Sequence, residues 1–304
     1  MEIQQLRHVV AVVEHGSICS AAEATNITQS GLSRSLKNLE NSIGLPLFKR
    51  GPRGVQPTLF GETLVARARL IINEHDRAMD ELRAVRHAKG GSIKIGMTPN
   101  FSLYFVSDAI SRYAAERPKI DFIVTTGPAP QLIEMLLAGD LDFAVALLGP
   151  NHELPDDLTA EILFESASVV LAHRDHPLAG RQNVTIEELA QHNWAIMDSP
   201  AFRSAFGRFF DENGQAKPRQ VLRTNSIAFL LRCVDEQKLL TVLPRITAGN
   251  QLAANLVKID APAFGALAHA GFVHRAHEFL MTPAMKNMMH VFRSEAARMM
   301  SGTA

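Results

Sequence analysis

Residues 28–43 read TQSGLSRSLKNLENSI, and this stretch decides how the N-terminal part of the chain folds. Leucines recur with the 3.6-residue period of an α-helix, so one face of the helix is predicted to be buried. A threonine just before such a helix accepts hydrogen bonds from the first free backbone N–H groups, and Thr28 stands at that place. We therefore predict a helix that begins after Thr28 and packs on Leu32, Leu36, Leu39 and Ile43.

The opposite face of this helix carries short polar side chains at its start and long cations one turn later. A helix laid in the major groove of DNA needs this order, because hydroxyl and amide groups near its N-terminus meet base edges and phosphates while arginine and lysine reach further out. Any surface helix also has a polar face, so the helix taken alone leaves both interpretations open. The candidate DNA-binding residues on the helix are Thr28, Gln29, Ser30, Ser33, Arg34 and Lys37.

Two shorter segments before Thr28 favour the DNA-binding interpretation. Residues 6–13 place apolar side chains at i, i+3, i+4 and i+7, and Gly16 stands where a helix C-cap is expected. Ser17 is predicted to cap a short second helix rich in alanine, whose small side chains let another helix approach closely. Three helices are therefore predicted before residue 44.

Residues 45–55, LPLFKRGPRGV, are predicted to form a β-hairpin wing, because hydrophobic residues alternate with Gly, Pro and cations in a way that does not continue a helix. The whole chain is neutral, with 31 basic and 31 acidic residues. From residue 34 to residue 53, however, five basic residues are opposed only by Glu40, so positive charge is concentrated there. Lys49, Arg50 and Arg53 are expected to bind phosphates and to supply salt-dependent affinity.

Residues 17–65 resemble the winged helix-turn-helix of LysR-type transcriptional regulators. The shared pattern consists of the alanines of the second helix, TQSxLSRxLxxLE, LxLFxRxxRGVxxT and the glycine that follows. Many members carry Pro-Ala where this chain has Ser30-Gly31, and a glycine costs a helix roughly 1 kcal/mol relative to alanine. The resemblance implies a multi-domain protein: an all-α winged helix-turn-helix, a long linker helix and a two-lobed α/β effector domain of the periplasmic-binding-protein-like fold.

Residues 58–85 contain no proline, and a helix of that length spans about 40 Å. Apolar residues alternate at spacings of four and three, a heptad seam that favours pairing with another helix. A helix packed only on its own chain is the alternative. The resemblance implies that this helix pairs two protomers and that two dimers form a tetramer. The seam consists of Leu64, Ala68, Ile71, His75, Ala78, Leu82 and Val85.

Strand and helix patterns alternate after the break HAKGGS at 87–92, which implies βαβ crossovers and a mostly parallel sheet. Among the expected elements are a helix over 101–116, short strands at 168–172 and 270–274, and a last helix that begins at Thr282-Pro283. Two α/β lobes suit this number of strands better than one sheet.

A chain of 304 residues is long enough for two or three domains, each with its own core. We expect a winged helix-turn-helix at 1–60, a linker helix at 58–89 and an effector domain at 91–304. The resemblance implies that the chain crosses between the lobes near Phe164 and returns near Gly265. Lobe I then takes 91–163 with 265–304, and lobe II takes 164–264.

Three turns that follow strands and precede helices form the candidate effector site. In a two-lobed α/β domain a ligand binds between the lobes, where helix N-termini point backbone N–H groups at it. Such N-termini attract anions, so an organic acid is the predicted effector. Ordinary helix caps would use the same residue types. The resemblance places the family's pocket positions at Thr98, Asn100, Thr126, Ser199 and Phe202, with Arg203 as a charge partner.

An enzyme and a solute-binding protein are the alternative classes. The motifs GxSxG, GxGxxG, GxxxxGK[ST], HExxH and CxxC do not occur, so no catalytic residue and no cofactor are predicted. The pairs His173/His176 and His274/His277 lack a convincing set of further ligands, so no metal site is predicted. A solute-binding protein would explain two lobes but would leave the first sixty residues without a role.

The remaining expectations concern partners and location. The N-terminus has no basic stretch followed by a long apolar core, and no apolar run reaches the roughly 18 residues that span a bilayer. We expect a cytoplasmic protein that binds double-stranded promoter DNA, a small-molecule effector, copies of itself and RNA polymerase, and no membrane. Cys19 and Cys233 are expected to be reduced thiols packed as small hydrophobic groups.

Overall fold

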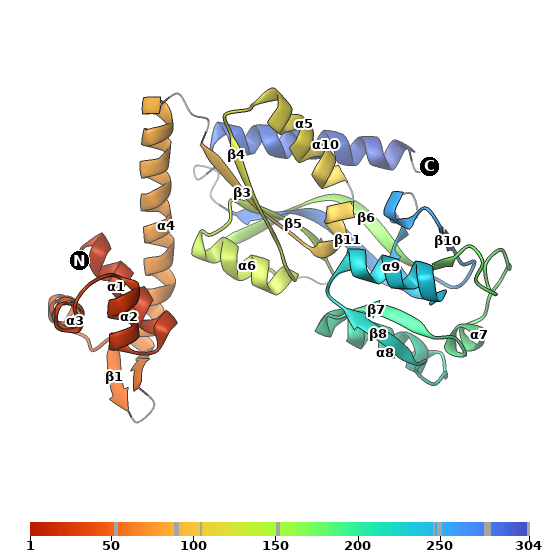
Figure 1. Cartoon of the computed structure of the whole chain (residues 1–304), viewed down its shortest axis with the longest axis horizontal. Helices are drawn as coiled ribbons and strands as arrows, with labels where there is room; N and C mark the ends of the chain where they lie inside the picture. Colours follow the sequence, from red (N-terminus) through yellow and green to blue (C-terminus); the bar gives the residue numbers. More distant parts are fainter. Residues whose placement is uncertain are drawn as a thin grey trace. The chain divides into compact units, whose positions relative to one another are not determined.

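The computed structural model describes residues 1–51, 54–87, 91–103, 105–149, 153–245, 247, 251–276 and 281–302. The chain divides into two compact units, residues 1–91 with 134–141 and residues 92–133 with 142–304 (Figure 1). Hydrophobic clusters lie within each unit, so each has its own core.

Local signals set the ends of the N-terminal helices as predicted. Gly16 ends the first helix with φ +67°. The Ser17 hydroxyl accepts a hydrogen bond from a backbone N–H of the second helix, and the Thr28 hydroxyl does the same for the third. The helices are α1 (Ile3–His15), α2 (Ile18–Ala24), α3 (Gln29–Ile43) and α4 (Leu59–His87).

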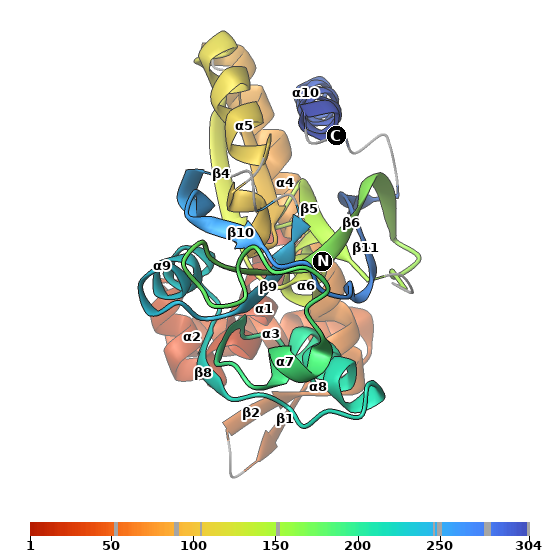
Figure 2. The ribbon, with the colours of Figure 1, turned by 90° about the vertical axis from the view of Figure 1, so that its right-hand side faces the viewer.

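The predicted wing is an antiparallel hairpin of β1 (Phe48–Gly51) and β2 (Gly54–Pro57). Figure 2 shows it extending past α2 and α3. The register places Lys49 opposite Gln56, so both side chains lie on the same face of the hairpin.

Two residues predicted to be buried are exposed. Ile43 is the last residue of α3, where the helix already leaves the core. Cys19 lies in the first turn of the short helix α2 and is exposed, whereas Cys233 is half-buried.

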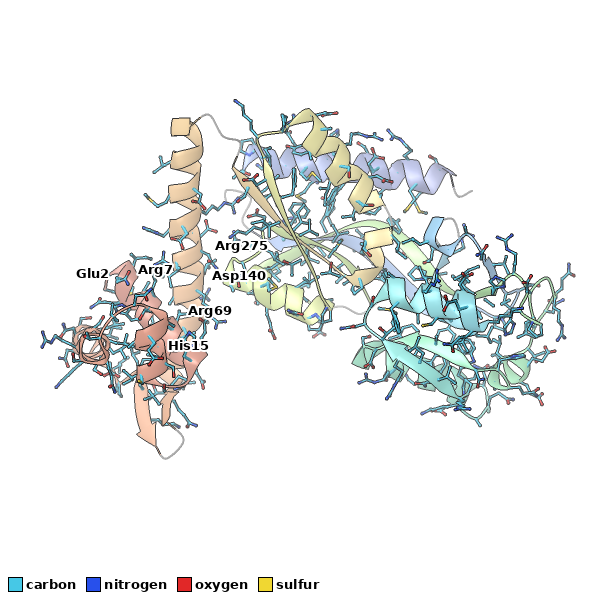
Figure 3. All side chains as sticks on the ribbon, viewed as in Figure 1. Glu2, Arg7, His15, Arg69, Asp140 and Arg275 are labelled. Atoms are coloured by element: carbon cyan, nitrogen blue, oxygen red, sulfur yellow. The ribbon has the colours of Figure 1, made fainter. Side chains whose placement is uncertain are left out.

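The N-terminal half of helix α4 packs against α1. Apolar residues of the two helices form a small buried cluster, and ion pairs join the same two helices (Figure 3 labels Arg7 and Arg69). The cluster contains Leu6, Ala68 and Ile72, and the ion pairs join Arg7 to Asp76 and Arg69 to Glu14.

The predicted heptad seam divides between two environments. Ala68 is fully buried in the contact with α1, whereas Ile71 is 42% exposed and Leu82 is 65% exposed. The helix therefore packs on its own chain near its start and leaves an apolar stripe open further along. The exposed seam residues are Ile71, His75, Ala78 and Leu82, and the side chain of Val85 lies outside the described part of the chain.

The second unit contains nine strands in two sheets. The strands are β3 (Ser92–Met97), β4 (Asp121–Thr126), β5 (Phe143–Leu148), β6 (Leu158–His173), β7 (Trp194–Met197), β8 (Gln220–Thr224), β9 (Thr241–Pro244), β10 (Leu256–Lys258) and β11 (Phe264–Arg275), as far as the described residues show. The larger sheet has the order β10-β6-β11-β5-β3-β4, with β9 also paired to β6, and the smaller sheet pairs β7 with β8.

The larger sheet is mixed, so the prediction of a mostly parallel sheet is wrong. Strand β3 runs parallel to β4 and β5, as βαβ crossovers require. Strand β11 is antiparallel to both β5 and β6, because the chain re-enters this sheet from the direction of the second lobe.

Strands β6 and β11 carry the chain between the lobes. The first half of β6 pairs with β11, and its second half pairs with β9 and β10. Phe264 pairs with Ser168 where the partners change, beside Gly265 with φ +74°. This course supports lobe boundaries near residues 164 and 265, which we retain as a proposal.

The helices after α4 connect these strands, and the second half of α6 groups with the first unit. A 3₁₀ turn precedes α5 where one helix was predicted over 101–116, because the Phe101 N–H bonds to Thr98 O at 3.0 Å. Thr282 caps the last helix as predicted, since its hydroxyl accepts the Met285 N–H at 3.3 Å. The elements are η1 (Pro99–Leu103), α5 (Phe105–Glu116), α6 (Ala129–Ala138), α7 (Ile186–Ala190), α8 (Pro200–Glu212), α9 (Ile227–Gln237), η3 (Gln251–Ala253) and α10 (Pro283–Gly302).

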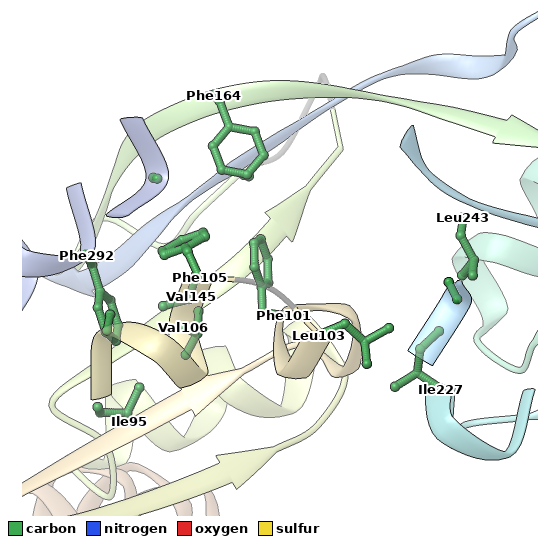
Figure 4. Close-up of a cluster of buried hydrophobic side chains, with 14 of the residues drawn as sticks. Ile95, Phe101, Leu103, Phe105, Val106, Val145, Phe164, Ile227, Leu243 and Phe292 are labelled. Atoms are coloured by element: carbon green, nitrogen blue, oxygen red, sulfur yellow. The ribbon is translucent and has the colours of Figure 1, made fainter. Parts of the chain in front are cut away.

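Two hydrophobic clusters hold the second unit together. The larger one lies under α5 and α10, which run side by side over the sheet, and it continues to α9 and β9 (Figures 1 and 4). In Figure 4, Leu103 of η1 points toward Ile227 and Leu243. The smaller cluster, in lobe II, surrounds the fully buried Trp194 with rings of α8 and with Phe264.

Candidate DNA interface and effector site

Helix α3 presents a polar face opposite its buried leucines. Leu32, Leu36 and Leu39 are buried, as predicted. Among the predicted DNA-binding residues of this helix, Ser33 is half-buried and the others are exposed. Within the described part of the chain, Arg34 and Lys37 form no ion pair with a carboxylate, so their charges remain available to an anionic partner.

The start of α3 is held by its own cap. Thr28 Oγ1 accepts the Gly31 N–H at 3.1 Å and lies 3.2 Å from Ser30 Oγ. A Cβ added to Gly31 would stand 3.0 Å from Thr28 Oγ1, so the glycine gives the cap room. Thr28 therefore fixes the N-terminus of α3, whether or not it also contacts DNA.

Glu40 anchors the wing to α3, a role that the sequence analysis missed. Its Oε1 accepts the Leu47 N–H at 2.7 Å and the Phe48 N–H at 3.1 Å. In the sequence Glu40 is visible only as the single acid within a basic segment. The bond ties the first wing strand to the helix whose polar face carries the candidate residues.

The wing cations are described only in part. Lys49 is exposed and forms no ion pair among the described residues. The backbone of Arg50 belongs to β1, but its side chain lies outside the described part of the structure, as does the whole of Arg53.

Three of the predicted effector residues lie at the carboxyl ends of the parallel strands of lobe I. Thr98 is only 7% exposed, and its hydroxyl lies 3.4 Å from the Leu147 N–H. Asn100 is half-buried in η1. Thr126 is exposed at the end of β4, where its register partner is Met97. The parallel strands therefore bring Thr98 and Thr126 to one edge.

The other three follow β7 in lobe II, and each already has a structural contact. The Ser199 hydroxyl caps α8 by accepting the Phe202 N–H at 3.2 Å. The Phe202 ring is half-buried and stacks on Phe264, with centroids 6.3 Å apart. Arg203 is exposed and paired with the carboxylate of Asp198. Within the described residues, no hydrogen bond or ion pair joins these three to the lobe I group.

Two cavities of lobe II lie away from all six predicted effector residues. One, of about 620 Å³, is lined by the segments before α7, after α8 and after β10. The other, of about 300 Å³, lies between α9 and the segment before β10. The described residues contain no group of three or more His, Cys, Asp or Glu side chains placed to hold a metal ion, and His277 lies outside them.

Two family models match nearly the whole chain. The model of the bacterial regulatory helix-turn-helix protein of the lysR family matches residues 3–62, and the model of the LysR substrate binding domain matches residues 86–297. The chain belongs to the LysR family of transcriptional regulators. The first match covers the three helices and the wing, and the second covers both lobes.

Individual relatives support this membership over the whole length. The SDS degradation transcriptional activation protein of Pseudomonas sp. is 32% identical over 312 residues, which cover 98% of this chain and 97% of the relative. The HTH-type transcriptional regulator GbpR of Rhizobium radiobacter is 33% identical over 241 residues, covering 76% and 78%. The structure of full-length CbnR in complex with its target DNA has the same fold, with a TM-score of 0.64, 17% identity and coverage of 98% and 100%.

This LysR-family protein is a DNA-binding transcription regulator with an effector-binding domain, not an enzyme. The same matches overturn the alternative of a solute-binding protein without a DNA-binding role, because residues 3–62 match the helix-turn-helix model. Among the described helices, none is both long and apolar enough to cross a membrane.

Proposed function

We propose that α3 reads promoter DNA through Thr28, Gln29, Ser30, Ser33, Arg34 and Lys37, while Lys49, Arg50 and Arg53 of the wing bind the phosphate backbone. The observation that carries this proposal is that Arg34 and Lys37 are exposed on the face of α3 opposite its buried leucines, and Lys49 is exposed on β1 of the wing. Among the described residues none of the three cations forms an ion pair. Arginine near the start of a groove-bound helix can form two hydrogen bonds with guanine. The wing cations supply affinity that depends on salt.

Replacing Arg34 by alanine is expected to lower the affinity for specific DNA by about tenfold or more, because a lost base contact costs about 1–3 kcal/mol. The measurement is a gel shift on the duplex that the wild-type protein selects from a random-sequence pool. Lys49→Ala is the matched control: it should weaken binding to all duplexes alike and reduce the dependence on salt. Unchanged affinity and sequence preference in Arg34→Ala would contradict the role given to this residue.

The active form is proposed to be an oligomer that pairs through α4. Ile71, Ala78 and Leu82 form an exposed stripe at heptad spacing, with His75 between them, and such a stripe is buried by a second helix. A dimer would place two α3 helices on a palindromic site, and two dimers would form the tetramer.

The effector is proposed to be an organic acid with an apolar body, bound between the lobes. The apolar side chains where η1 meets α9 and β9 suit an apolar body (Figure 4). The half-buried ring of Phe202 suits it as well. Arg203 would bind the anionic group, which requires exchanging Asp198 for the ligand. One relative is named for activation of SDS degradation, and SDS likewise joins an alkyl chain to an anion.

A thermal-shift series tests the effector class. Hexanoate, octanoate and octyl sulfate are compared with the neutral hexanol and octanol, on the wild type and on Arg203→Gln. A ligand at about 100 times its Kd stabilises by about 2.7 kcal/mol, which raises Tm by several degrees. We expect the anions to raise Tm in the wild type and to lose most of this effect in Arg203→Gln. Stabilisation by the neutral compounds only, or by none, would refute the proposed acid.

Effector binding is proposed to act by shifting the spacing of the paired α3 helices, which changes how the promoter DNA is bent. Recruitment of RNA polymerase would change accordingly. The protein is expected to act in the cytoplasm, where promoter DNA and RNA polymerase are found.

A further inference from the structure

A buried histidine connects the first helix to the recognition helix. His8 of α1 is only 7% exposed. Its Nδ1 lies 2.8 Å from Ser35 Oγ of α3, and its Nε2 lies 3.2 Å from the side-chain nitrogen of Gln4. Both ring nitrogens therefore have a polar partner, and one partner belongs to the helix that carries Arg34.

The partners define the form of the imidazole. The Gln4 amide nitrogen donates and cannot accept, so Nε2 is the acceptor and Nδ1 carries the proton. The Nδ1–H then donates to the Ser35 hydroxyl. Burial lowers the pKa of His8, which keeps the ring neutral near pH 7.

This bond adds a directional restraint to the apolar contacts of α3, on the side that faces α1. Leu32, Leu36 and Leu39 hold the helix against the core, but hydrophobic contact is not directional. A hydrogen bond is directional and weakens steeply with angle. A rotation of α3 by about 10° moves a side chain by about 1 Å at the ~5 Å radius of a helix, which is enough to break a base contact. Ser35 directly follows Arg34 in α3, so a rotation of the helix that strains the Ser35 bond also turns Arg34.

We propose that His8 is a positioning residue for promoter recognition, because its hydrogen bond to Ser35 sets the rotation of α3 and with it the preference for specific over unrelated DNA. This inference rests on the proposed role of the α3 face. It assigns sequence preference, and not only stability, to a buried residue that does not touch DNA.

The test compares affinities for the selected duplex and for an unrelated duplex of equal length. Ser35→Ala and His8→Phe are each expected to lower the ratio of the two affinities about fivefold, the size of one hydrogen bond, while affinity for the unrelated duplex stays unchanged. The double variant should be no worse than His8→Phe alone, because both changes remove the same bond. His8→Asn, whose amide N–H takes the place of Nδ1–H, should restore the ratio to within about twofold of the wild type.

A purely structural role would give a different result. In that case Tm falls while the ratio of affinities in Ser35→Ala and His8→Phe stays within about twofold of the wild type, and the inference is overturned. If His8→Phe fails to fold, Ser35→Ala and His8→Asn decide the question. Arg34→Ala is measured beside them. If the ratio of affinities falls in Arg34→Ala but is unchanged in Ser35→Ala, only this inference is rejected. If the ratio is unchanged in Arg34→Ala, the proposed role of the α3 face itself is rejected.

Discussion

Replacing Gly61 by alanine is expected to disrupt the winged helix-turn-helix and to abolish specific DNA binding. Gly61 lies in the first turn of α4, where an added Cβ would stand 2.2 Å from Leu47 O and 3.2 Å from Leu47 C. These are backbone atoms, and Leu47 O already accepts the Thr58 N–H at 2.9 Å. The clash therefore displaces the start of the wing. Overpacking lowers the free energy of unfolding by about 1–3 kcal/mol, and by more where the backbone must move. For Gly61→Ala we therefore expect the free energy of unfolding of this domain to fall by about 3 kcal/mol or more.

Gly51→Ala is the matched control for this substitution. Gly51 is the last residue of β1 in the wing, and a Cβ there would meet no atom of the described residues within 4 Å. Hydrogen exchange of the amides of residues 3–62 and affinity for the selected duplex should be near wild type in Gly51→Ala. Both should change strongly in Gly61→Ala. Wild-type exchange and affinity in Gly61→Ala would show that the contact with Leu47 can relax.

The N-terminal elements could be predicted because their signals are local. Gly16, Ser17 and Thr28 each end or begin a helix through a hydrogen bond or a positive φ within a few residues. The antiparallel course of β11 could not be predicted in this way, since it depends on strands about a hundred residues or more earlier in the chain. For the same reason the predicted strands at 168–172 and 270–274 are only the ends of the long strands β6 and β11.

The residues of the candidate sites also differ in whether local sequence or tertiary contacts determine their surroundings. The exposed face of α3 follows from helical periodicity, so the spacing of its leucines is enough to name the residues on it. The contacts of Glu40 with the wing, of His8 with Ser35 and of Arg203 with Asp198 depend on side chains that tertiary packing or a turn brings together. A capping serine and a ligand-binding serine also have the same sequence signature, which is why Ser199 could be placed at a helix start but not given one role.

Lobe II contains a histidine pair whose titration should be measurable as a loss of stability in acid. His176 is only 5% exposed, its ring lies 4.8 Å from that of His192, and its Nδ1 accepts the Leu178 N–H at 3.1 Å. Burial, with a smaller contribution from His192, lowers the pKa of His176 to about 4. The pKa of His192 is also lowered, mainly by burial. The folded lobe therefore holds a neutral His176 in conditions where the unfolded chain would protonate it.

The consequence is a loss of unfolding free energy as the pH falls from 6.5 toward 4. Above pH 6.5 His176 is neutral in both states and has no effect; below it only the unfolded state gains the proton, which lowers stability by about 2 kcal/mol at pH 5 and about 3 kcal/mol at pH 4. Trp194 is the only tryptophan and is buried in the same lobe, so its fluorescence in urea titrations at pH 7 and pH 5 reports this transition. His176→Asn keeps an acceptor for the Leu178 N–H but does not titrate. It should therefore remove most of the difference in unfolding free energy between pH 7 and pH 5. An equal loss in wild type and His176→Asn would mean that other groups, His192 first among them, cause the acid sensitivity of lobe II.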